Sequence, residues 1–462
     1  MDTVVTALRA ALHDPDGAIV RTVPGVLDAA RTDKSGWIAP GGPVAVVEAR
    51  TVEHVQATLR TCSALGVPVV PRGAGTGLAG GANGTEGTVV LSVARMDRIV
   101  EVSVEDELAV VEPGVLNGAL NAAVVEHGLR FAPDPASAAI ASIGGNIATN
   151  AGGLRCVKYG VTREAVLGLD VVLADGRLVS TGHRTVKGVT GLDLTALLVG
   201  SEGTLGVIVG ATVRLVPVPA GEPATLGAVY PTVQQAAAAA AAVVAGPERP
   251  STVELLDALA LEGIAAYLGP EVLSETVGSS SAGGVFLLVE FDGAGATEAA
   301  LGAVPGLQAE GGTVHLAGSA AERERLLTIR RSFHAAMEAR GRVLIEDVAV
   351  PRSRLAEMFA RVEAIGREHG VSIPTVAHAG DGNLHPNFVF DGDEVPAHVW
   401  DAADAVFRAA IELGGTLTGE HGVGVLKRRW IGDELGDDVL DLQRGIRRVF
   451  DPAGILNPGK VF

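Results

Sequence analysis

Three glycine-rich tracts, at residues 71–81, 133–153 and 197–208, constrain the fold of this chain more than any other feature. Glycine adds no side chain to a core, but it lets the backbone approach a flat or extended ligand closely. The first tract directly follows a strand–helix–strand pattern at residues 45–70, which is typical of a parallel pair of strands. The sequence therefore predicts a domain in which loops carry the ligand.

The first tract contains Gly75, Gly77 and Gly80 at the G-x-G-x-x-G spacing of dinucleotide-binding sites. The residues that follow, Ala-Asn-Gly-Thr-Glu-Gly, cannot continue as the helix that a Rossmann site requires, and this context counts against such a site. Successive backbone N–H groups in such a loop would form a nest for a pyrophosphate. A flexible surface loop is the alternative interpretation.

Residues 377–387 read Ala-His-Ala-Gly-Asp-Gly-Asn-Leu-His-Pro-Asn. A hairpin closed by the central Gly and Asn residues would bring His378 and His385 toward each other. Glu420 and His421, with a glycine on each side, add a carboxylate and a third imidazole. Two His and one carboxylate are a usual ligand set for a catalytic divalent cation. Spacing alone is also compatible with unrelated histidines, so the residues leave the metal interpretation open.

Composition narrows the class of protein. A chain of 462 residues suggests two or three domains, and a net charge of −18 argues against a nucleic-acid surface. Two cysteines are too few for a disulfide framework, which favours a reducing compartment. Neither a secretory signal nor a stretch of roughly 20 apolar residues is evident. We expect a soluble cytoplasmic protein, with peripheral docking on a membrane partner left open.

A change of texture near residues 217–223, which are rich in proline, predicts a domain boundary. Beyond it, apolar strands such as 225–230 and 285–291 and a long helix at 320–339 predict an antiparallel sheet with helices on one side, resembling a ferredoxin-like α+β domain. The turn-rich tail from residue 451 is expected to return to the first domain.

Seven motifs occur in the order that is characteristic of one protein family. Together they resemble the flavoproteins of vanillyl-alcohol-oxidase type, in the branch of D-2-hydroxyacid dehydrogenases, D-lactate dehydrogenases and glycolate oxidase D-subunits, over roughly residues 30–462. The motifs are Pro71-Arg-Gly-Ala-Gly-Thr-Gly-Leu, Pro133-Asp-Pro-Ala-Ser, Ser142-Ile-Gly-Gly-Asn, Gly200-Ser-Glu-Gly-Thr-Leu-Gly, His378-Ala-Gly-Asp-Gly-Asn-Leu-His, Gly419-Glu-His-Gly and Asn457-Pro-Gly-Lys.

The resemblance implies an α+β protein with a two-part FAD-binding domain of vanillyl-alcohol-oxidase type at 1–220. It implies a ferredoxin-like α+β cap domain with the metal site at 221–430, and a segment at 431–462 that returns to the FAD domain. FAD is expected to bind without a covalent link in the first loop, because no His lies between Arg72 and Gly81.

The residues that the resemblance assigns to FAD come from the three glycine-rich tracts and from the tail. They are Pro71, Arg72, Gly73, Ala74, Gly75, Thr76, Gly77, Leu78, Pro133, Asp134, Pro135, Ser137, Ser142, Gly144, Gly145, Asn146, Asn150, Gly152, Gly153, Glu202, Gly206, Ile208 and Asn457.

The resemblance also assigns the chemistry. It implies that His378, His385 and Glu420 bind a divalent metal, with zinc expected and manganese or iron as alternatives, and that His421 removes the hydroxyl proton while hydride passes to flavin N5. Two simpler roles stay open: His421 could bond a backbone carbonyl, and Glu420 could orient His421 instead of binding metal.

For the substrate, the resemblance assigns Arg330 to the carboxylate, with Asn387 and His334 as further contacts. Asn387 could equally cap a turn. A glutamate, Glu346, takes the place of a lysine found in the 2-hydroxyglutarate enzymes, and it would repel a second carboxylate by about 1 kcal/mol or more. We therefore expect oxidation of a short D-2-hydroxy acid, such as D-lactate or glycolate, to the 2-oxo acid.

Several alternatives remain at this point. D-2-hydroxyglutarate dehydrogenase is one, and the flavin subunit of a multi-subunit glycolate oxidase is another. A metal hydrolase would leave the glycine tracts unexplained, and the sequence does not separate a dehydrogenase from an oxidase that releases peroxide. Expected electron acceptors are a quinone, a cytochrome, an electron-transfer flavoprotein or a separate iron–sulfur subunit; a homodimer is left open.

Overall fold

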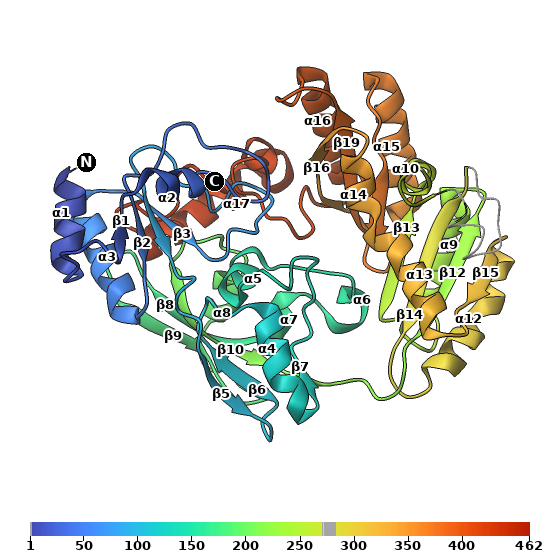
Figure 1. Ribbon diagram of the computed structural model, residues 1–462, viewed down its shortest axis with the longest axis horizontal. Helices are drawn as coiled ribbons and strands as arrows, with labels where there is room; N and C mark the ends of the chain where they lie inside the picture. The colour runs from blue at the N-terminus through green and yellow to red at the C-terminus, as the bar shows by residue number, and fades with distance from the viewer. Residues whose placement is uncertain (1, 270, 272–282) are drawn as a thin grey trace. The chain divides into compact units, whose positions relative to one another are not determined.

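The computed structural model describes residues 2–269, 271 and 283–462, which form two compact units (Figure 1). The first unit contains residues 1–153, 160–218 and 420–462, and the second contains 154–159 and 219–419. The first boundary at 218/219 lies close to the one expected near 220. Residues 420–430 belong to the first unit, whereas they were expected in the cap domain.

The first unit contains a small sheet that begins the chain. Its strand order is β1-β2-β4-β3, and β2 pairs in parallel with β4, which pairs in parallel with β3. The α3 helix between β2 and β3 starts at Thr51, whose side chain accepts the His54 N–H, and ends at Gly66 in the left-handed conformation. The elements are α1 (Asp2–Ala11), β1 (Val20–Arg21), α2 (Pro24–Ala29), β2 (Ala45–Glu48), α3 (Val52–Leu65), β3 (Val69–Arg72) and β4 (Val89–Ser92).

A second, antiparallel sheet of the first unit has the order β5-β6-β10-β8-β9. Short helices carry the second glycine-rich tract beside it, and α17 leads to the C-terminal tail. The elements are β5 (Ile99–Ser103), β6 (Leu108–Val111), α4 (Asn117–Val124), β7 (Leu129–Arg130), α5 (Ile143–Thr149), α7 (Thr162–Ala165), β8 (Val166–Val172), β9 (Leu178–Gly182), α8 (Leu194–Leu198), β10 (Val207–Arg214), β11 (Val216–Pro217) and α17 (Ile431–Phe450).

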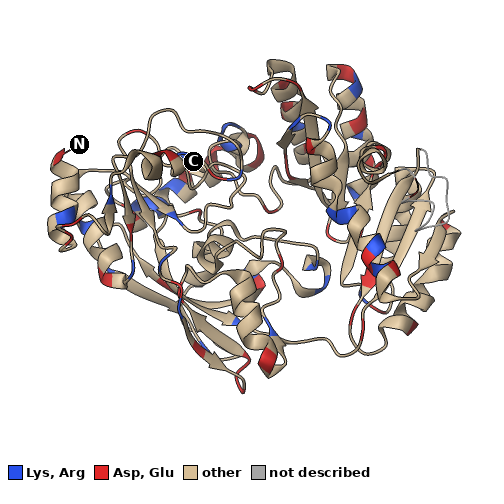
Figure 2. Ribbon diagram, in the orientation of Figure 1, with Lys and Arg blue, Asp and Glu red and all other residues tan. Residues whose placement is uncertain are grey.

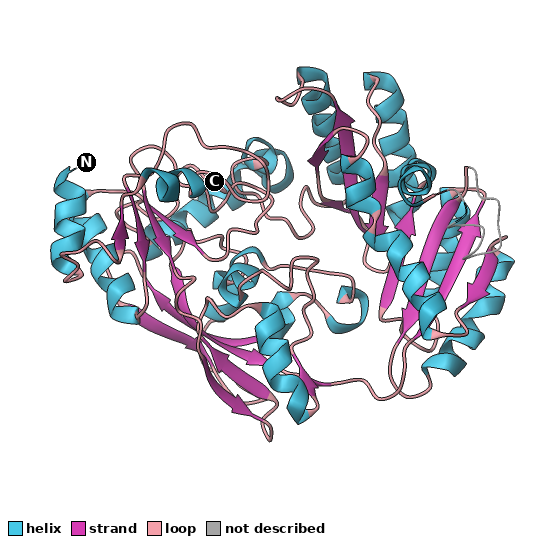
Figure 3. Ribbon diagram, viewed as in Figure 1, coloured by secondary structure: helices cyan, strands magenta, loops and turns pink. Residues whose placement is uncertain are grey.

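The second unit is built on one antiparallel sheet of order β15-β12-β14-β13-β18-β19-β16, with β17 also pairing with β19 (Figure 3). Its elements are α6 (Cys156–Tyr159), β12 (Ala224–Tyr230), α9 (Val233–Val244), β13 (Thr252–Leu256), α10 (Ala258–Leu268), β14 (Val285–Phe291), α12 (Ala296–Ala309), β15 (Thr313–Leu316), α13 (Ala320–Arg331), α14 (Phe333–Glu338), β16 (Arg342–Ile345), β17 (Val348–Ala349), α15 (Leu355–His369), β18 (Thr375–His378), β19 (Asn383–Phe390) and α16 (Ala397–Glu412).

Both faces of this sheet are covered, so the prediction of helices on one side was wrong. Successive residues of a strand point to opposite faces, yet Leu287 and Leu288 are both at most 1% exposed. The α10, α13 and α14 helices build the core on one face, and α9, α12 and α15 pack together on the other. The physical reason is the run of five apolar residues, Val285–Val289, in β14, which fits a strand buried on both sides.

The long helix predicted at 320–339 is in fact two helices, α13 and α14, separated at Ser332. In the first of them acidic and basic residues alternate over positions 322–325 (Figure 2), and Leu326, Leu327 and Ile329 are buried. None of the helices in the described ranges combines the length and apolar character needed to cross a bilayer.

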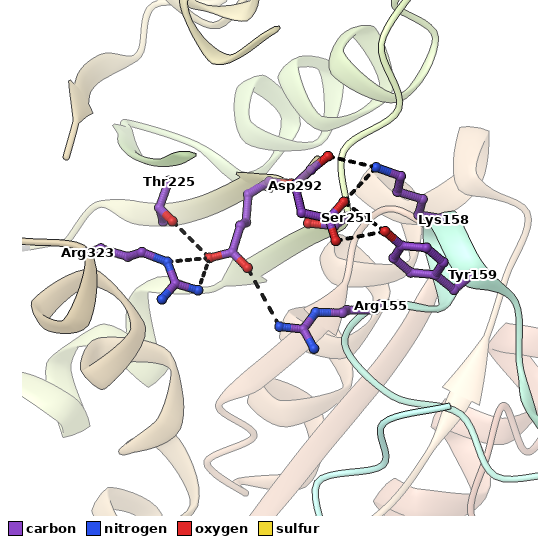
Figure 4. A network of polar contacts seen from close by, with 8 residues as sticks. Arg155, Lys158, Tyr159, Thr225, Ser251, Asp292 and Arg323 are labelled. Atoms are coloured by element: carbon purple, nitrogen blue, oxygen red, sulfur yellow. Dashed lines mark hydrogen bonds and ion pairs between the residues drawn. The ribbon is translucent and has the colours of Figure 1, made fainter. Parts of the chain in front are cut away.

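A short excursion of the chain, residues 154–159, belongs to the second unit and was not expected from the sequence. Polar contacts to β14 and to the residue after it hold it there (Figure 4). Lys158 Nζ lies 2.6 Å from Asp292 Oδ1, and the Tyr159 hydroxyl donates to Asp292 Oδ2 at 2.7 Å. The Arg155 guanidinium lies 3.9 Å from the Glu290 carboxylate.

Candidate active site

The two histidines of residues 377–387 lie on neighbouring strands of one hairpin. His378 ends β18 and His385 lies inside β19, where it is opposite Val376. His378 is two residues beyond Val376, so both imidazoles project from the same face of the sheet. Their ring centroids are 5.1 Å apart with an interplanar angle of 84°, and both side chains are buried. Strand pairing therefore fixes the distance between them.

The Glu420 carboxylate joins this pair. One ligand atom from each of His378, His385 and Glu420 lies within 4.8 Å of the others. The chain explains the proximity, because Gly419 packs against the hairpin: a Cβ atom added there would lie 2.3 Å from Asn383 Nδ2. The residue after Gly419 is thereby carried to the two imidazoles. The donor set, two imidazoles and a carboxylate, fits a divalent transition-metal ion such as zinc.

A buried glutamate on the central strand β13 links His378 to Arg330. Glu254 is 0% exposed; its Oε1 lies 2.6 Å from His378 Nδ1, and its Oε2 accepts from Arg330 Nε at 2.5 Å. Burial by itself would raise the pKa of Glu254, but the contacts with His378 and Arg330 outweigh it and hold the pKa below its usual value. Glu254 was not among the residues predicted from the sequence.

A second buried carboxylate supports the other imidazole. Asp347 is 0% exposed, and its Oδ1 lies 3.8 Å from His385 Nδ1 and accepts from Asn383 Nδ2 at 2.6 Å. Its Oδ2 accepts from the Thr418 hydroxyl at 2.8 Å, two residues before Glu420. Asp347 thus ties the hairpin to the segment that ends at Gly419.

Of the further residues predicted near the substrate, Asn387 and Glu346 are buried, whereas His334 is exposed. Asn387 lies within β19, not in a turn, and its Nδ2 donates to the His385 carbonyl at 2.9 Å. Among the described residues, its buried Oδ1 has no hydrogen-bond partner. His334 is exposed on α14, with Nε2 3.2 Å from Glu338 Oε1. Glu346 is buried, and its N–H donates to the Pro386 carbonyl at 3.0 Å.

In the first unit, a glycine lets the backbone of the first tract lie directly against the Ser142 side chain of the second tract. A Cβ atom at Gly73 would lie 2.5 Å from Ser142 Oγ, and the Ala74 N–H donates to the same hydroxyl at 3.3 Å. Ser142 also caps α5 by accepting the Gly145 N–H. Within the second tract, a Cβ atom at Gly153 would lie 2.3 Å from the Asp134 carbonyl oxygen.

The remaining residues predicted for FAD surround these contacts. Pro71 and Arg72 end β3, the loop from Thr76 to Leu78 follows, and Asn150 adopts the left-handed conformation at the end of α5. Among the described residues, Nδ2 of Asn146 is buried without a hydrogen-bond partner. An unpaired buried donor of this kind is suited to bond a ligand. The others lie in the second tract, the 200–206 turn or β10: Pro133, Pro135, Ser137, Gly144, Gly152, Gly206 and Ile208.

The C-terminal tail supports the first tract from behind. Asn457 Nδ2 donates to the carbonyls of Gly81 at 3.0 Å and Glu202 at 2.8 Å. Lys460, which is 1% exposed, donates to the carbonyls of Gly81 at 3.0 Å and Asn83 at 2.6 Å. Because these carbonyls accept hydrogen bonds from the tail, the N–H groups of the loop can point the other way, toward a phosphate.

Glu202 holds the segment that contains His421. Its carboxylate accepts the N–H groups of Val423 at 2.8 Å and Gly424 at 2.9 Å. Burial raises the pKa of Glu202, and the two hydrogen bonds offset only part of this effect. The Val425 N–H in turn donates to the Ala79 carbonyl at 2.8 Å. The half-buried His421 is therefore anchored to Glu202 two residues further along the chain, and to the first glycine-rich tract four residues further along.

Comparison with family models matches two parts of the chain. Residues 43–182 match the model described as an FAD binding domain. Residues 222–461 match the model described as the C-terminal domain of FAD linked oxidases. The two matches together include both units.

Comparison with individual proteins gives relatives of similar length. The chain is 41% identical over 427 residues to the glycolate oxidase subunit GlcD of Bacillus subtilis, covering 91% of this chain and 89% of that protein. It is 37% identical over 417 residues to a D-lactate dehydrogenase of Archaeoglobus fulgidus, covering 90% of each. Among solved structures, p-cresol methylhydroxylase with bound substrate shares the fold with a TM-score of 0.78, at 19% identity, covering 100% of this chain and 96% of that chain.

Proposed function

Because this chain belongs to the family of FAD-linked oxidases, we propose that it oxidises a short D-2-hydroxy acid, of the D-lactate or glycolate type, to the 2-oxo acid. The family and the α+β fold of vanillyl-alcohol-oxidase type expected from the motifs are confirmed, and the chain is an FAD-linked oxidoreductase. The observation that carries the substrate class is the cluster of His378, His385 and Glu420, connected through Glu254 to Arg330.

The substrate carboxylate is assigned to Arg330. Its Nε is engaged by Glu254, which fixes the plane of the guanidinium and leaves the terminal nitrogens for a carboxylate. The Asn387 amide, buried with an unused oxygen in the described structure, supplies a second polar contact. These two side chains would hold the acid in one orientation, which is what a stereospecific reaction at its α-carbon requires.

Removal of the hydroxyl proton is assigned to an imidazole nitrogen of His421. His378, His385 and Glu420 would hold a divalent cation, zinc in the first instance, which lowers the pKa of a hydroxyl group bound to it. Glu202 holds the backbone just after His421, so the imidazole is carried by an ordered segment. Non-covalent FAD, bound by the glycine-rich tracts, supplies the hydride acceptor.

The preference for one carboxylate is assigned to Glu346. This side chain is buried next to Asp347, and its backbone pairs with Pro386, the neighbour of Asn387. A second carboxylate on the substrate would meet this acidic part of the site at a cost of about 1 kcal/mol or more. Glycolate, D-lactate and other short acids avoid that cost.

The test is steady-state dye reduction by the purified chain with glycolate, D-lactate, L-lactate and D-2-hydroxyglutarate. We expect kcat/KM for D-lactate or glycolate to exceed that for D-2-hydroxyglutarate by roughly 5-fold or more, which is the rate equivalent of about 1 kcal/mol. The reverse order would contradict the proposal. Reduction only after a separate partner subunit is added would identify the chain as the flavin subunit of an assembly.

A further inference from the structure

Glu254 does more than neutralise a buried arginine. We propose that it is a positioning residue, whose two oxygens hold the metal ligand His378 and the substrate-binding Arg330 in fixed orientations, so that the cation and the carboxylate of the substrate are bound in register. This inference rests on the proposed function, which assigns those two roles. Glu254 faces His378 directly across the β13–β18 pair, and all three residues lie in the second unit.

The contact with His378 selects one ring nitrogen for the metal. Glu254 Oε1 lies 2.6 Å from Nδ1, a hydrogen-bond distance at which Nδ1–H donates to the carboxylate. The proton is thereby kept on Nδ1, and the lone pair of Nε2 is the one left for a cation. An imidazole hydrogen bonded to a carboxylate in this way is also a more basic and better oriented ligand.

The contact with Arg330 leaves part of the guanidinium unused. Oε2 accepts from Nε at 2.5 Å, and Arg330 is only 16% exposed at its side chain. The planar guanidinium has five N–H donors, so a carboxylate on Nε still leaves the terminal NH₂ groups for a second carboxylate. The ammonium group of a lysine has its three donors on one nitrogen atom, so it does not present two separate binding edges. One buried carboxylate can therefore fix the metal ligand and the substrate ligand at once.

A second buried glutamate–arginine ion pair, whose arginine also lies on α13, allows this role to be separated from simple charge neutralisation. Glu290 of β14 is 3% exposed and accepts from Arg323 Nε at 2.9 Å and Nη2 at 2.7 Å (Figure 4). Arg323 and Arg330 are both on α13, seven residues or about two turns apart. The two glutamates differ in what else they contact: Glu290 accepts from the Thr225 hydroxyl at 2.9 Å, whereas Glu254 contacts an imidazole.

The experiment compares Glu254→Gln with Glu290→Gln and the wild type, all loaded with FAD. Zinc affinity is measured by titration of the chelated proteins, and pyruvate affinity by the flavin difference spectrum at saturating zinc. Both variants are expected to lower the melting temperature. Only Glu254→Gln is expected to lose about 10- to 100-fold in zinc affinity, the range seen for lost outer-shell partners, and to bind pyruvate more weakly at saturating zinc.

Equal zinc and pyruvate affinities in the two variants would overturn the positioning role. A wild-type protein that binds no zinc, manganese or iron would instead remove the metal site itself, and that result is read without any variant. If Glu254→Gln does not fold, the histidine nitrogens of the zinc-loaded wild type are measured by ¹⁵N NMR. A proton on Nδ1 of His378 supports the proposal, and a proton on Nε2 overturns it.

Discussion

Val376 and His385 are cross-strand partners in the β18–β19 hairpin, and this register places His378 and His385 on one face with ring centroids 5.1 Å apart. A shift of the register by one residue would turn one of the imidazoles to the opposite face. Two of the three candidate metal ligands thus lie on a regular sheet. Sites carried by strands are held more precisely than sites carried by loops.

Replacing His385 with Ala is expected to abolish stoichiometric metal binding while FAD is retained. The imidazole belongs to the three-residue cluster, whereas the glycine-rich tracts assigned to FAD lie in the first unit. Loss of a direct ligand should lower metal affinity by more than about 100-fold, the upper range for an outer partner. The metal and flavin contents of the same preparation check this, and full metal content in the variant would contradict it.

Replacing His421 with Asn is expected to lower turnover by about 100- to 10,000-fold, which is the usual contribution of a positioned acid or base. FAD and metal contents should stay unchanged. The control is His398→Asn, an exposed histidine on α16. Near-normal turnover of the His421 variant would contradict a catalytic role and would favour a structural hydrogen bond.

Replacing Lys460 with Met is expected to weaken FAD binding. The Nζ group donates to the carbonyls of Gly81 and Asn83, and each such hydrogen bond contributes roughly 0.5–1.5 kcal/mol. The dissociation constant, measured by flavin fluorescence on apoprotein, should therefore rise by about 10- to 100-fold. Lys187→Met, at an exposed position, is the control. Unchanged FAD affinity would show that the tail does not shape the loop.

The same lysine predicts a pH dependence of stability in the FAD-free protein. Burial lowers the pKa of Lys460 from 10.5 to about 7, so between these values the folded protein binds fewer protons than the unfolded chain. Stability should then rise as pH increases through this window, by on the order of 1 kcal/mol per pH unit. Denaturant unfolding at pH 7 to 9 should show a steeper rise for the wild type than for Lys460→Met. Parallel profiles would contradict this.

Local chemistry made much of this site predictable from the sequence. Gly and Asn residues with turn propensity lie at the centre of the hairpin, so a meeting of His378 and His385 could be expected before the structure was known. Gly73 and Gly153 likewise signal close backbone approach, and the structure places other polar atoms within 2.5 Å of where their Cβ atoms would be. In each case the signal lies within a few residues of the contact.

The parts that the sequence did not reveal depend on which strands and helices become neighbours. Glu254 sits in an apolar stretch 124 residues before His378, and nothing near it in the chain indicates that β13 pairs with β18. The excursion at residues 154–159 is recognised only through its contacts with Asp292, 133 residues or more away. The break at Ser332 was missed because Ser is compatible with either a helix interior or a helix end.

The central claim is that a divalent cation held by His378, His385 and Glu420 assists oxidation of a 2-hydroxy acid by the bound flavin. The most direct measurement is anaerobic bleaching of the flavin by D-lactate and by glycolate in one preparation, before chelation, after chelation and after zinc is restored. The account predicts rapid bleaching by at least one of these acids, loss of most of the rate on chelation with FAD still bound, and recovery with zinc. Bleaching at an unchanged rate in the metal-free protein would contradict it.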